Sequence, residues 1–210
     1  MKIILIFFKP LFWLIAVFCV GLCGLILPET RFFFNGLTPL NLVFSALMVV
    51  LSLKTTEISG FIKIFLMIGV LGWTAEWIGV HTGWLFGSYK YGTILGWGPM
   101  NIPLLIGLNW ALLSYCVYQW IGFLTGWKMW ISGAFAMTAF DALLEPVAIE
   151  LGYWSWTGNS VPWTNYLTWW MLSIPCLYLW ERFTKKRFNP TAAWFLWIQV
   201  LFFSALNFVL

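Results

Sequence analysis

The chain consists largely of apolar segments that are each long enough, or nearly long enough, to cross a lipid bilayer. A transmembrane helix needs about 20 predominantly apolar residues. Seven such segments can be marked in the sequence: 11–27, 37–53, 61–80, 102–123, 129–151, 166–180 and 192–210. Since 62% of the residues are hydrophobic and only 9% are charged, a soluble domain could not bury this apolar surface. We expect a single transmembrane domain over residues 1–210, folded as an all-α polytopic membrane helix bundle of about seven transmembrane helices.

The positions of Lys and Arg favour a cytoplasmic N-terminus, because cytoplasmic loops carry an excess of these residues. In a seven-helix layout, only Arg31 and Lys90 fall outside. The other nine of the eleven basic residues fall on the cytoplasmic side: Lys2, Lys9, Lys54, Lys63, Lys128, Arg182, Lys185, Lys186 and Arg187. This distribution explains the net charge of +4 without a nucleic-acid partner. Because the first segment is barely long enough and the sixth is short, six helices are the alternative.

Two connections between the predicted helices are rich in glycine and aromatic residues. The first follows the third helix, over residues 81–99, and the second covers residues 152–165. A merely solvated loop would be more polar, and irregular backbone at membrane depth must be buried in protein or line a cavity. We expect the first connection to fold back against the bundle and the second to form a lid at the level of the lipid headgroups.

Carboxyl side chains lie within two of the predicted spans, and no Lys or Arg is deep enough to pair with them. Glu76 lies in the third helix, and Asp141, Glu145 and Glu150 lie in the fifth. An ionisable group at the centre of a membrane helix costs about 2.5–3.5 kcal/mol, so it is a functional-site hypothesis by default. Asp141 and Glu145 are four residues apart and therefore share a helix face, whereas Glu150 lies on another side, near the interface. A carboxylic acid kept neutral in an apolar pocket can donate a proton to a weak base, although hydrogen bonding between helices is the structural alternative.

The sequence does not indicate a metal, a cofactor or a disulfide. The four cysteines (Cys19, Cys23, Cys116, Cys176) lie in apolar segments and form no CxxC pair. The single histidine, His81, lies just beyond the third predicted helix. It is a candidate for orienting a water molecule, or else a loop residue that only makes hydrogen bonds.

The motifs of residues 70–170 resemble those of the CruF-type carotenoid hydratases. The first is Gly72-Trp73-x-x-Glu76-x-x-Gly79, which continues to Thr82-Gly83-x-x-Phe86-Gly87-x-Tyr89-x-Tyr91. Pro103-Leu104-Leu105-Ile106 with Trp110 follows, then Asp141-x-x-x-Glu145-Pro146, Gly152-x-Trp154-x-Trp156 and Pro162-x-x-Asn165-Tyr166-x-x-Trp169. Members of that family often have Asp where this chain has Glu145, which keeps an acid but moves it.

This resemblance implies that water is added to the terminal 1,2 (or 1′,2′) double bond of an acyclic carotenoid end group, as in lycopene or γ-carotene. The substrate would come from the bilayer of a bacterial or archaeal inner (cytoplasmic) membrane, so that water and membrane lipid are the other partners. The acids that match the motifs are Glu76, Asp141 and Glu145, with His81 as a further catalytic candidate. The candidate substrate-binding residues are Trp73, Trp77, Phe86, Tyr89, Trp110 and Asn165. Aromatic faces among them would stabilise the tertiary cation that alkene protonation produces, and no metal or cofactor is required.

Three other functions fit some of these features. A carotenoid cyclase, of the kind that acts on lycopene, also protonates an alkene, but a neighbouring double bond captures the cation. A proton-coupled transporter would use Glu76 and Asp141 as a relay, although the polar residues concentrate in one leaflet. A non-catalytic pigment-binding protein would keep its ligand when the acids are replaced by amides.

Overall fold

The computed structural model describes residues 9–158, 160–184 and 187–210. Lys2, Lys185 and Lys186, which the predicted layout places in the cytoplasm, lie outside these residues. The described chain forms eight α-helices: α2 (Pro10–Ile26), α3 (Pro28–Gly36), α4 (Thr38–Leu51), α5 (Thr55–Thr82), α6 (Leu104–Trp120), α7 (Trp127–Glu150), α8 (Trp163–Phe183) and α9 (Pro190–Val209). Two short strands, β1 (Tyr89–Tyr91) and β2 (Trp154–Trp156), and a 3₁₀ turn, Pro99–Asn101, complete it.

The helix boundaries follow from local chemistry. Proline stands in the first turn of α2, α3, α4 and α9, where its missing N–H would have no partner and its fixed φ suits a helix. α5 ends where Gly83 adopts a left-handed conformation with φ 69°, which glycine tolerates without strain. Each of the seven predicted apolar segments coincides with one of these helices. The short α3 was not predicted, because its sequence is too polar to be recognised as part of a span.

Fewer than seven of the described helices satisfy the length and hydropathy expected of a membrane span. α5, α7 and α9 do, and α3 with α4 count as a fourth span only if the pair, bent by 58°, is taken together. α2 is apolar but has only 17 residues. The all-α membrane bundle is thus supported by the structure, whereas the count of seven spans and the cytoplasmic N-terminus stay predictions.

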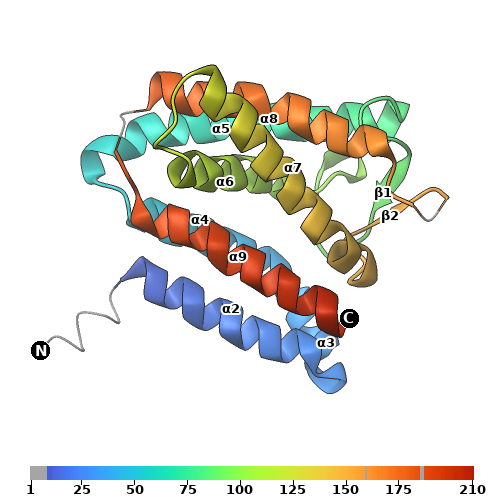
Figure 1. Ribbon diagram of the computed structural model, residues 1–210. Coiled ribbons are helices and arrows are strands. Elements are labelled where there is room, and N and C mark those ends of the chain that lie inside the picture. The colour runs from blue at the N-terminus through green and yellow to red at the C-terminus, as the bar shows by residue number, and fades with distance from the viewer. Residues whose placement is uncertain (1–8, 159, 185–186) are drawn as a thin grey trace, which may run out of the picture.

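α6 is the central helix of the bundle. It packs against α4, α5, α7, α8 and α9, and Figure 1 shows it enclosed between the group α5, α7 and α8 and the group α4 and α9, with α2 beyond. Most of its residues from Ile106 to Gln119 are buried. Because protein rather than lipid surrounds α6, it can carry polar side chains such as Asn109 and Gln119 at a depth where lipid would penalise them.

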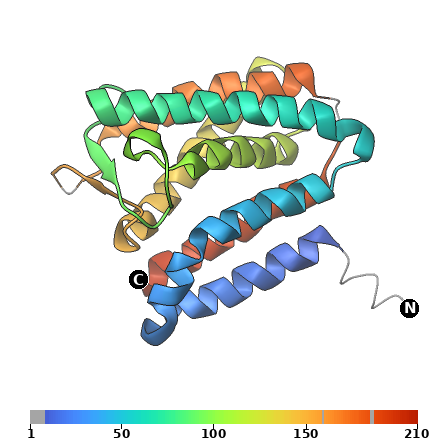
Figure 2. The ribbon, with the colours of Figure 1, turned by 180° about the vertical axis from the view of Figure 1, so that it is seen from behind.

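α5 and α6 approach each other at two facing glycines, Gly69 and Gly107. A Cβ atom on Gly107 would lie 2.5 Å from the carbonyl oxygen of Gly69, so only glycine fits at this crossing. Small residues of this kind let membrane helices pack backbone to backbone. Seen from behind, α5 lies directly over α6 along its length (Figure 2).

The two aromatic connections pair with each other as a two-stranded antiparallel sheet. Tyr89 faces Trp156, and Tyr91 faces Trp154. The first connection folds back against the bundle as expected, since Phe86 is 1% exposed and Tyr89 is buried. The pairing itself was not predicted. It places a cap, here named the aromatic cap (β1 and β2), at the end of the bundle where α5 and α7 finish (Figure 1).

Replacing Gly107 by alanine should destabilise the protein by about 1–3 kcal/mol, because the added methyl group meets backbone that cannot move aside. Unfolding of the purified protein in detergent micelles measures the effect. Gly60→Ala is the matched control on α5, since a Cβ at Gly60 meets nothing within 4 Å. Equal stability of the two variants would show that the α5–α6 crossing is not as tight as described.

Candidate active site

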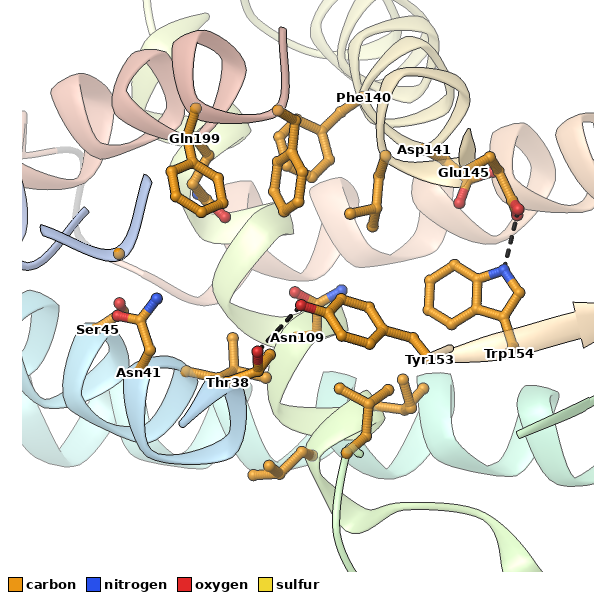
Figure 3. A pocket seen from close by; sticks show the side chains of 18 of the residues that line it. Thr38, Asn41, Ser45, Asn109, Phe140, Asp141, Glu145, Tyr153, Trp154 and Gln199 are labelled. Carbon is orange, nitrogen blue, oxygen red and sulfur yellow. Dashed lines mark hydrogen bonds between the residues drawn. The ribbon is translucent and has the colours of Figure 1, made fainter. Parts of the chain in front are cut away.

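A cavity of about 430 Å³ lies under the aromatic cap and extends between the two groups of helices. Its lining is mostly apolar and comes from α2, α4, α5, α6, α7, α8, α9 and the cap. The side chains of Glu76, Asp141 and Glu145 lie on this cavity, and each is at most 5% exposed. The structure therefore brings together the three carboxyl groups that the sequence singled out, although they come from two helices. Figure 3 shows the two acids of α7 at one side of the cavity.

Glu76 accepts hydrogen bonds from three aromatic side chains. Both cap tyrosines reach its Oε2 atom: the Tyr91 hydroxyl lies at 2.7 Å, and the Tyr89 hydroxyl makes a second, short bond. The indole nitrogen of Trp110 lies 3.0 Å from Oε1. Burial, followed by the nearby Glu76 carboxylate, raises the pKa of both cap tyrosines above its usual value, so both phenols keep their protons and remain donors.

Glu145 is held by the other strand of the cap. The indole nitrogens of Trp154 and Trp156 donate to its Oε2 atom at 2.9 and 3.0 Å. An indole N–H can only donate, so Oε2 acts as an acceptor in any protonation state. Within the described residues no hydrogen bond reaches Oε1, which leaves that oxygen for a group in the cavity.

Asp141 has the simplest hydrogen bonding of the three. Its Oδ2 atom accepts one bond, at 2.7 Å, from the side-chain amide of Asn165 at the start of α8. No other hydrogen bond to this carboxyl group is made by the part of the chain that the structure describes. The number of donors thus falls from three on Glu76 to two on Glu145 and one on Asp141.

The alternation of the cap strands explains how two short segments supply four donors. Successive side chains of a strand point to opposite faces, so Tyr89 and Tyr91 share the inner face with Trp154 and Trp156, while Lys90 and its partner Ser155 are exposed. Sequence reasoning identified the acids but missed Tyr91, Trp154 and Trp156 as their donors. The repeats Tyr-x-Tyr and Trp-x-Trp could have indicated these donors, because their two-residue period is that of side chains on one face of a strand.

Two indole rings form an aromatic wall beside the acids. Trp110 and Trp169 stack with ring centroids 4.0 Å apart and an angle of 16° between their planes, and both line the cavity. Trp110 fits against α5 because residue 72 is glycine, where a Cβ atom would lie 2.5 Å from the ring. Phe86 likewise packs against Gly79, where a Cβ atom would lie 2.5 Å from its ring. The small-residue positions on either side of Glu76 therefore admit neighbouring rings.

The structure divides the remaining candidates into two sets. Phe86, Tyr89, Trp110 and Asn165 lie on the cavity, but Trp73, Trp77 and His81 are not among its lining residues. The indole of Trp73 donates to the carbonyl of Ile102. His81 is exposed and its Nδ1 atom bonds to the carbonyl of Trp77, so its position does not support a role in orienting water at the acids. Glu150 is exposed, as expected of an interfacial charge.

The cavity lining contains no Lys, Arg or His among the described residues, so no basic side chain pairs with the three carboxyl groups there. Within the same residues, no group of three or more His, Cys, Asp or Glu side chains is placed to hold a metal ion. The arrangement is suited to moving a proton between buried acids and an apolar molecule.

Comparison with known proteins identifies the family of the chain. Residues 36–210 match the family described as carotenoid biosynthesis protein. The chain belongs to this family. The match covers α4 to α9, the cap and all three acids, and it confirms the family resemblance seen in the motifs.

One curated relative, a bisanhydrobacterioruberin hydratase of Haloarcula japonica, is 29% identical over 105 residues. The aligned region covers 45% of this chain and 36% of that relative, so the chain spans little more than a third of the relative's length. No solved structure matches this carotenoid biosynthesis family member.

Replacing Tyr91 by phenylalanine should lower the free energy of unfolding by about 1.5–3 kcal/mol, because it removes a hydrogen bond to a buried carboxyl group. Denaturant or thermal unfolding in micelles measures the loss. Tyr178→Phe is the control, since that tyrosine is 40% exposed and makes no hydrogen bond among the described residues. A Tyr91 variant as stable as the Tyr178 variant would contradict the geometry of the cap.

Proposed function

We propose that this membrane protein is a carotenoid hydratase that adds water to the terminal 1,2 (or 1′,2′) double bond of an acyclic carotenoid end group. The proposal rests on one observation above all: three buried carboxyl groups line a single apolar cavity, with no basic partner there among the described residues. The family match and the hydratase named among the relatives support it. Lycopene and γ-carotene are representative substrates, which enter from the lipid of a bacterial or archaeal inner membrane.

Asp141 is the proposed proton donor. A hydrogen bond donated to a carboxylate stabilises its charged form, and Asp141 receives the fewest, from Asn165 alone. Since like charges in one apolar cavity repel, the three groups favour a state with at most one ionised member. Glu76, with three donors, is the group best suited to carry that charge.

The reaction begins when the Asp141 carboxylic acid transfers its proton to the less substituted carbon of the terminal double bond. A new C–H bond forms from the π electrons, and the neighbouring carbon becomes a tertiary cation. Trp110 and Trp169 both line the cavity, and their aromatic rings are the groups proposed to stabilise the cation, with about 2 kcal/mol or more from a desolvated cation–π contact. The bond between Trp110 and the Glu76 carboxylate directs additional negative charge toward the same ring.

Water then attacks the cation through its oxygen and forms the C–O bond of a tertiary alcohol. The proton that this water loses returns to the Asp141 carboxylate, directly or through the free Oε1 atom of Glu145 one helical turn away. The net change is the addition of one water molecule, and the acid is restored without an oxidant or reductant. The apolar lining excludes other water from the cation, which favours addition at one carbon.

Expression of this chain in a bacterium that makes lycopene or γ-carotene should yield pigments heavier by one or two molecules of water, because each acyclic end can be hydrated once. Mass spectrometry of the extracted pigments makes the measurement, with cells that carry an empty vector as the control. A pigment of changed retention but unchanged mass would instead identify a cyclase. Unchanged pigments despite abundant protein in the membrane would contradict the hydratase.

The Asp141→Asn variant should lose at least 100-fold in conversion, since general acid catalysis typically contributes about 10²–10⁴-fold. Glu150→Gln is the matched control on the same helix, because Glu150 is exposed and should leave conversion unchanged. Initial rates are compared in membranes that contain equal amounts of folded protein. Full activity of the Asp141 variant would remove it as the donor, and the same measurement on Glu145→Gln would then test its neighbour.

A further inference from the structure

The wall of the cavity formed by α4 carries polar side chains that the proposed reaction does not use. Thr38, Asn41 and Ser45 recur at steps of three and four, so they lie on one face of the helix, and all three line the cavity. Gln199 of α9 lines it as well. Figure 3 shows Asn41, Ser45 and Gln199 toward one side of the cavity and the two acids of α7 toward the other. The cavity therefore has polar groups toward two ends, and Thr38, Asn109 and Tyr153 lie between them.

The two ends differ in how their hydrogen bonds are satisfied. Thr38, nearest the cap, bonds to the Tyr153 hydroxyl at 3.0 Å. Farther along α4, the Oδ1 atom of Asn41 and the Oγ atom of Ser45 are buried and have no partner among the described residues. Ser45 is only 1% exposed. Buried polar atoms without a partner are rare in native proteins, and each one needs an explanation such as a bound molecule.

The hydroxyl group of Ser45 contrasts with those of three other helical residues. Thr82, Thr138 and Ser173 each donate to the carbonyl four residues earlier, at 2.7, 2.9 and 2.6 Å. A bond to the carbonyl four residues earlier is the usual hydrogen bond of a serine or threonine hydroxyl within a helix. Ser45 makes no such bond, so its hydroxyl stays available to a molecule in the cavity.

Gln199 adds a further acceptor at the same end. It is 6% exposed, and its amide nitrogen reaches the carbonyl of Phe195 only at 3.5 Å. Its side-chain oxygen accepts no hydrogen bond from the described residues. The region thus offers two amide oxygens that need a donor and one serine hydroxyl that can donate or accept.

We propose that Asn41, Ser45 and Gln199 bind a hydroxyl group on those isoprenoid substrates that carry one, at a point along the chain away from the double bond that is hydrated. Lycopene and γ-carotene are hydrocarbons, so they would occupy the cavity without this contact. The inference rests on the proposed function, because it takes an isoprenoid chain as the occupant of the cavity. A hydroxyl group donates to an amide oxygen and accepts from Ser45 at once. A ketone or ether oxygen only accepts and would donate to neither amide oxygen, whereas the single hydrogen of a hydroxyl group fills one of the two. The bound hydroxyl fixes the position of the substrate along the cavity relative to the acids.

Short isoprenoids that share the terminal double bond of an acyclic carotenoid test this subsite. Geraniol, farnesol and geranylgeraniol place a hydroxyl at increasing distances from that bond, and each is compared with the hydrocarbon of the same skeleton. Binding to the purified full chain in micelles is followed by quenching of tryptophan fluorescence. At least one alcohol should bind about fivefold more tightly than its hydrocarbon, the preference that one or two net hydrogen bonds give.

The double variant Asn41→Leu with Ser45→Ala should lose this preference while it binds the hydrocarbons as before. Ser59→Ala, at an exposed position of α5, is the control and should keep the preference. Equal binding of every alcohol and its hydrocarbon by the unaltered protein would overturn the subsite, as would a preference that survives in the double variant. A site that holds only water gives the first of these results, and failure of every probe to bind counts against the subsite equally.

Stability separates a ligand site from a structural role. Because the Oγ atom of Ser45 has no partner to lose, Ser45→Ala should not lower the melting temperature, and a clear decrease would assign the hydroxyl to the fold and overturn the proposal. The binding measurements require no turnover. Alcohols that bind with the expected preference while lycopene stays unhydrated would therefore contradict the proposed function and leave the subsite standing.

Discussion

The hydrogen bonds between the aromatic cap and the buried carboxyl groups are the interaction on which the rest of the site depends. Buried carboxyl groups need hydrogen-bond donors, and no lysine or arginine lines the cavity among the described residues. The cap supplies two phenols to Glu76 on α5 and two indoles to Glu145 on α7. Each strand thereby ties one helix end to the sheet, and the pairing of the strands ties α5 to α7. Aromatic donors suit this task, since they deliver a hydrogen bond while the remainder of the side chain stays apolar.

The same hydrogen bonds give the three acids different environments. Both carboxyl oxygens of Glu76 accept hydrogen bonds. One oxygen of Glu145 accepts bonds from two indoles, and one oxygen of Asp141 accepts a bond from a single amide. Chemistry that protonates an alkene and then deprotonates water needs an acid and a base at one place. Carboxyl groups of identical chemistry can divide these roles only if their surroundings differ. The unequal number of donors is such a difference, and it comes from the geometry of the cap rather than from the acids themselves.

The sequence was sufficient to predict seven of the eight helices of the described residues and to single out the acids, but not to predict the contacts that organise them. Apolar length locates a helix, and the four-residue step places Asp141 and Glu145 on one face. Which of two nearby rings points into a cavity is decided by packing: Trp73 lies one turn from Glu76 in sequence, yet its indole bonds to the carbonyl of Ile102. Gly72 would have been the better guide, since the face it leaves open is the one that Trp110 occupies. The pairing of Tyr91 with Trp154 could not be predicted from the sequence, because strands of three residues from distant connections have no pattern that specifies a partner.

The polar groups at the two ends of the cavity differ in whether the protein itself satisfies their hydrogen bonds. This contrast indicates how a long apolar molecule would be positioned. At the cap, the protein's own donors occupy acceptors that would otherwise be unfilled, so the acids are held in place before any ligand arrives. On α4, the Oδ1 atom of Asn41 and the Oγ atom of Ser45 have no partner among the described residues, although Ser173 on α8 bonds to a carbonyl of its own helix. Four aromatic donors bind the acids at one end of the cavity, whereas oxygen atoms at the other end have no donor among the described residues. The two ends of the cavity therefore differ in how much of their hydrogen bonding is already satisfied. In the proposed function, the reaction takes place at the preorganised end, and the substrate is recognised where hydrogen bonds are still to be made.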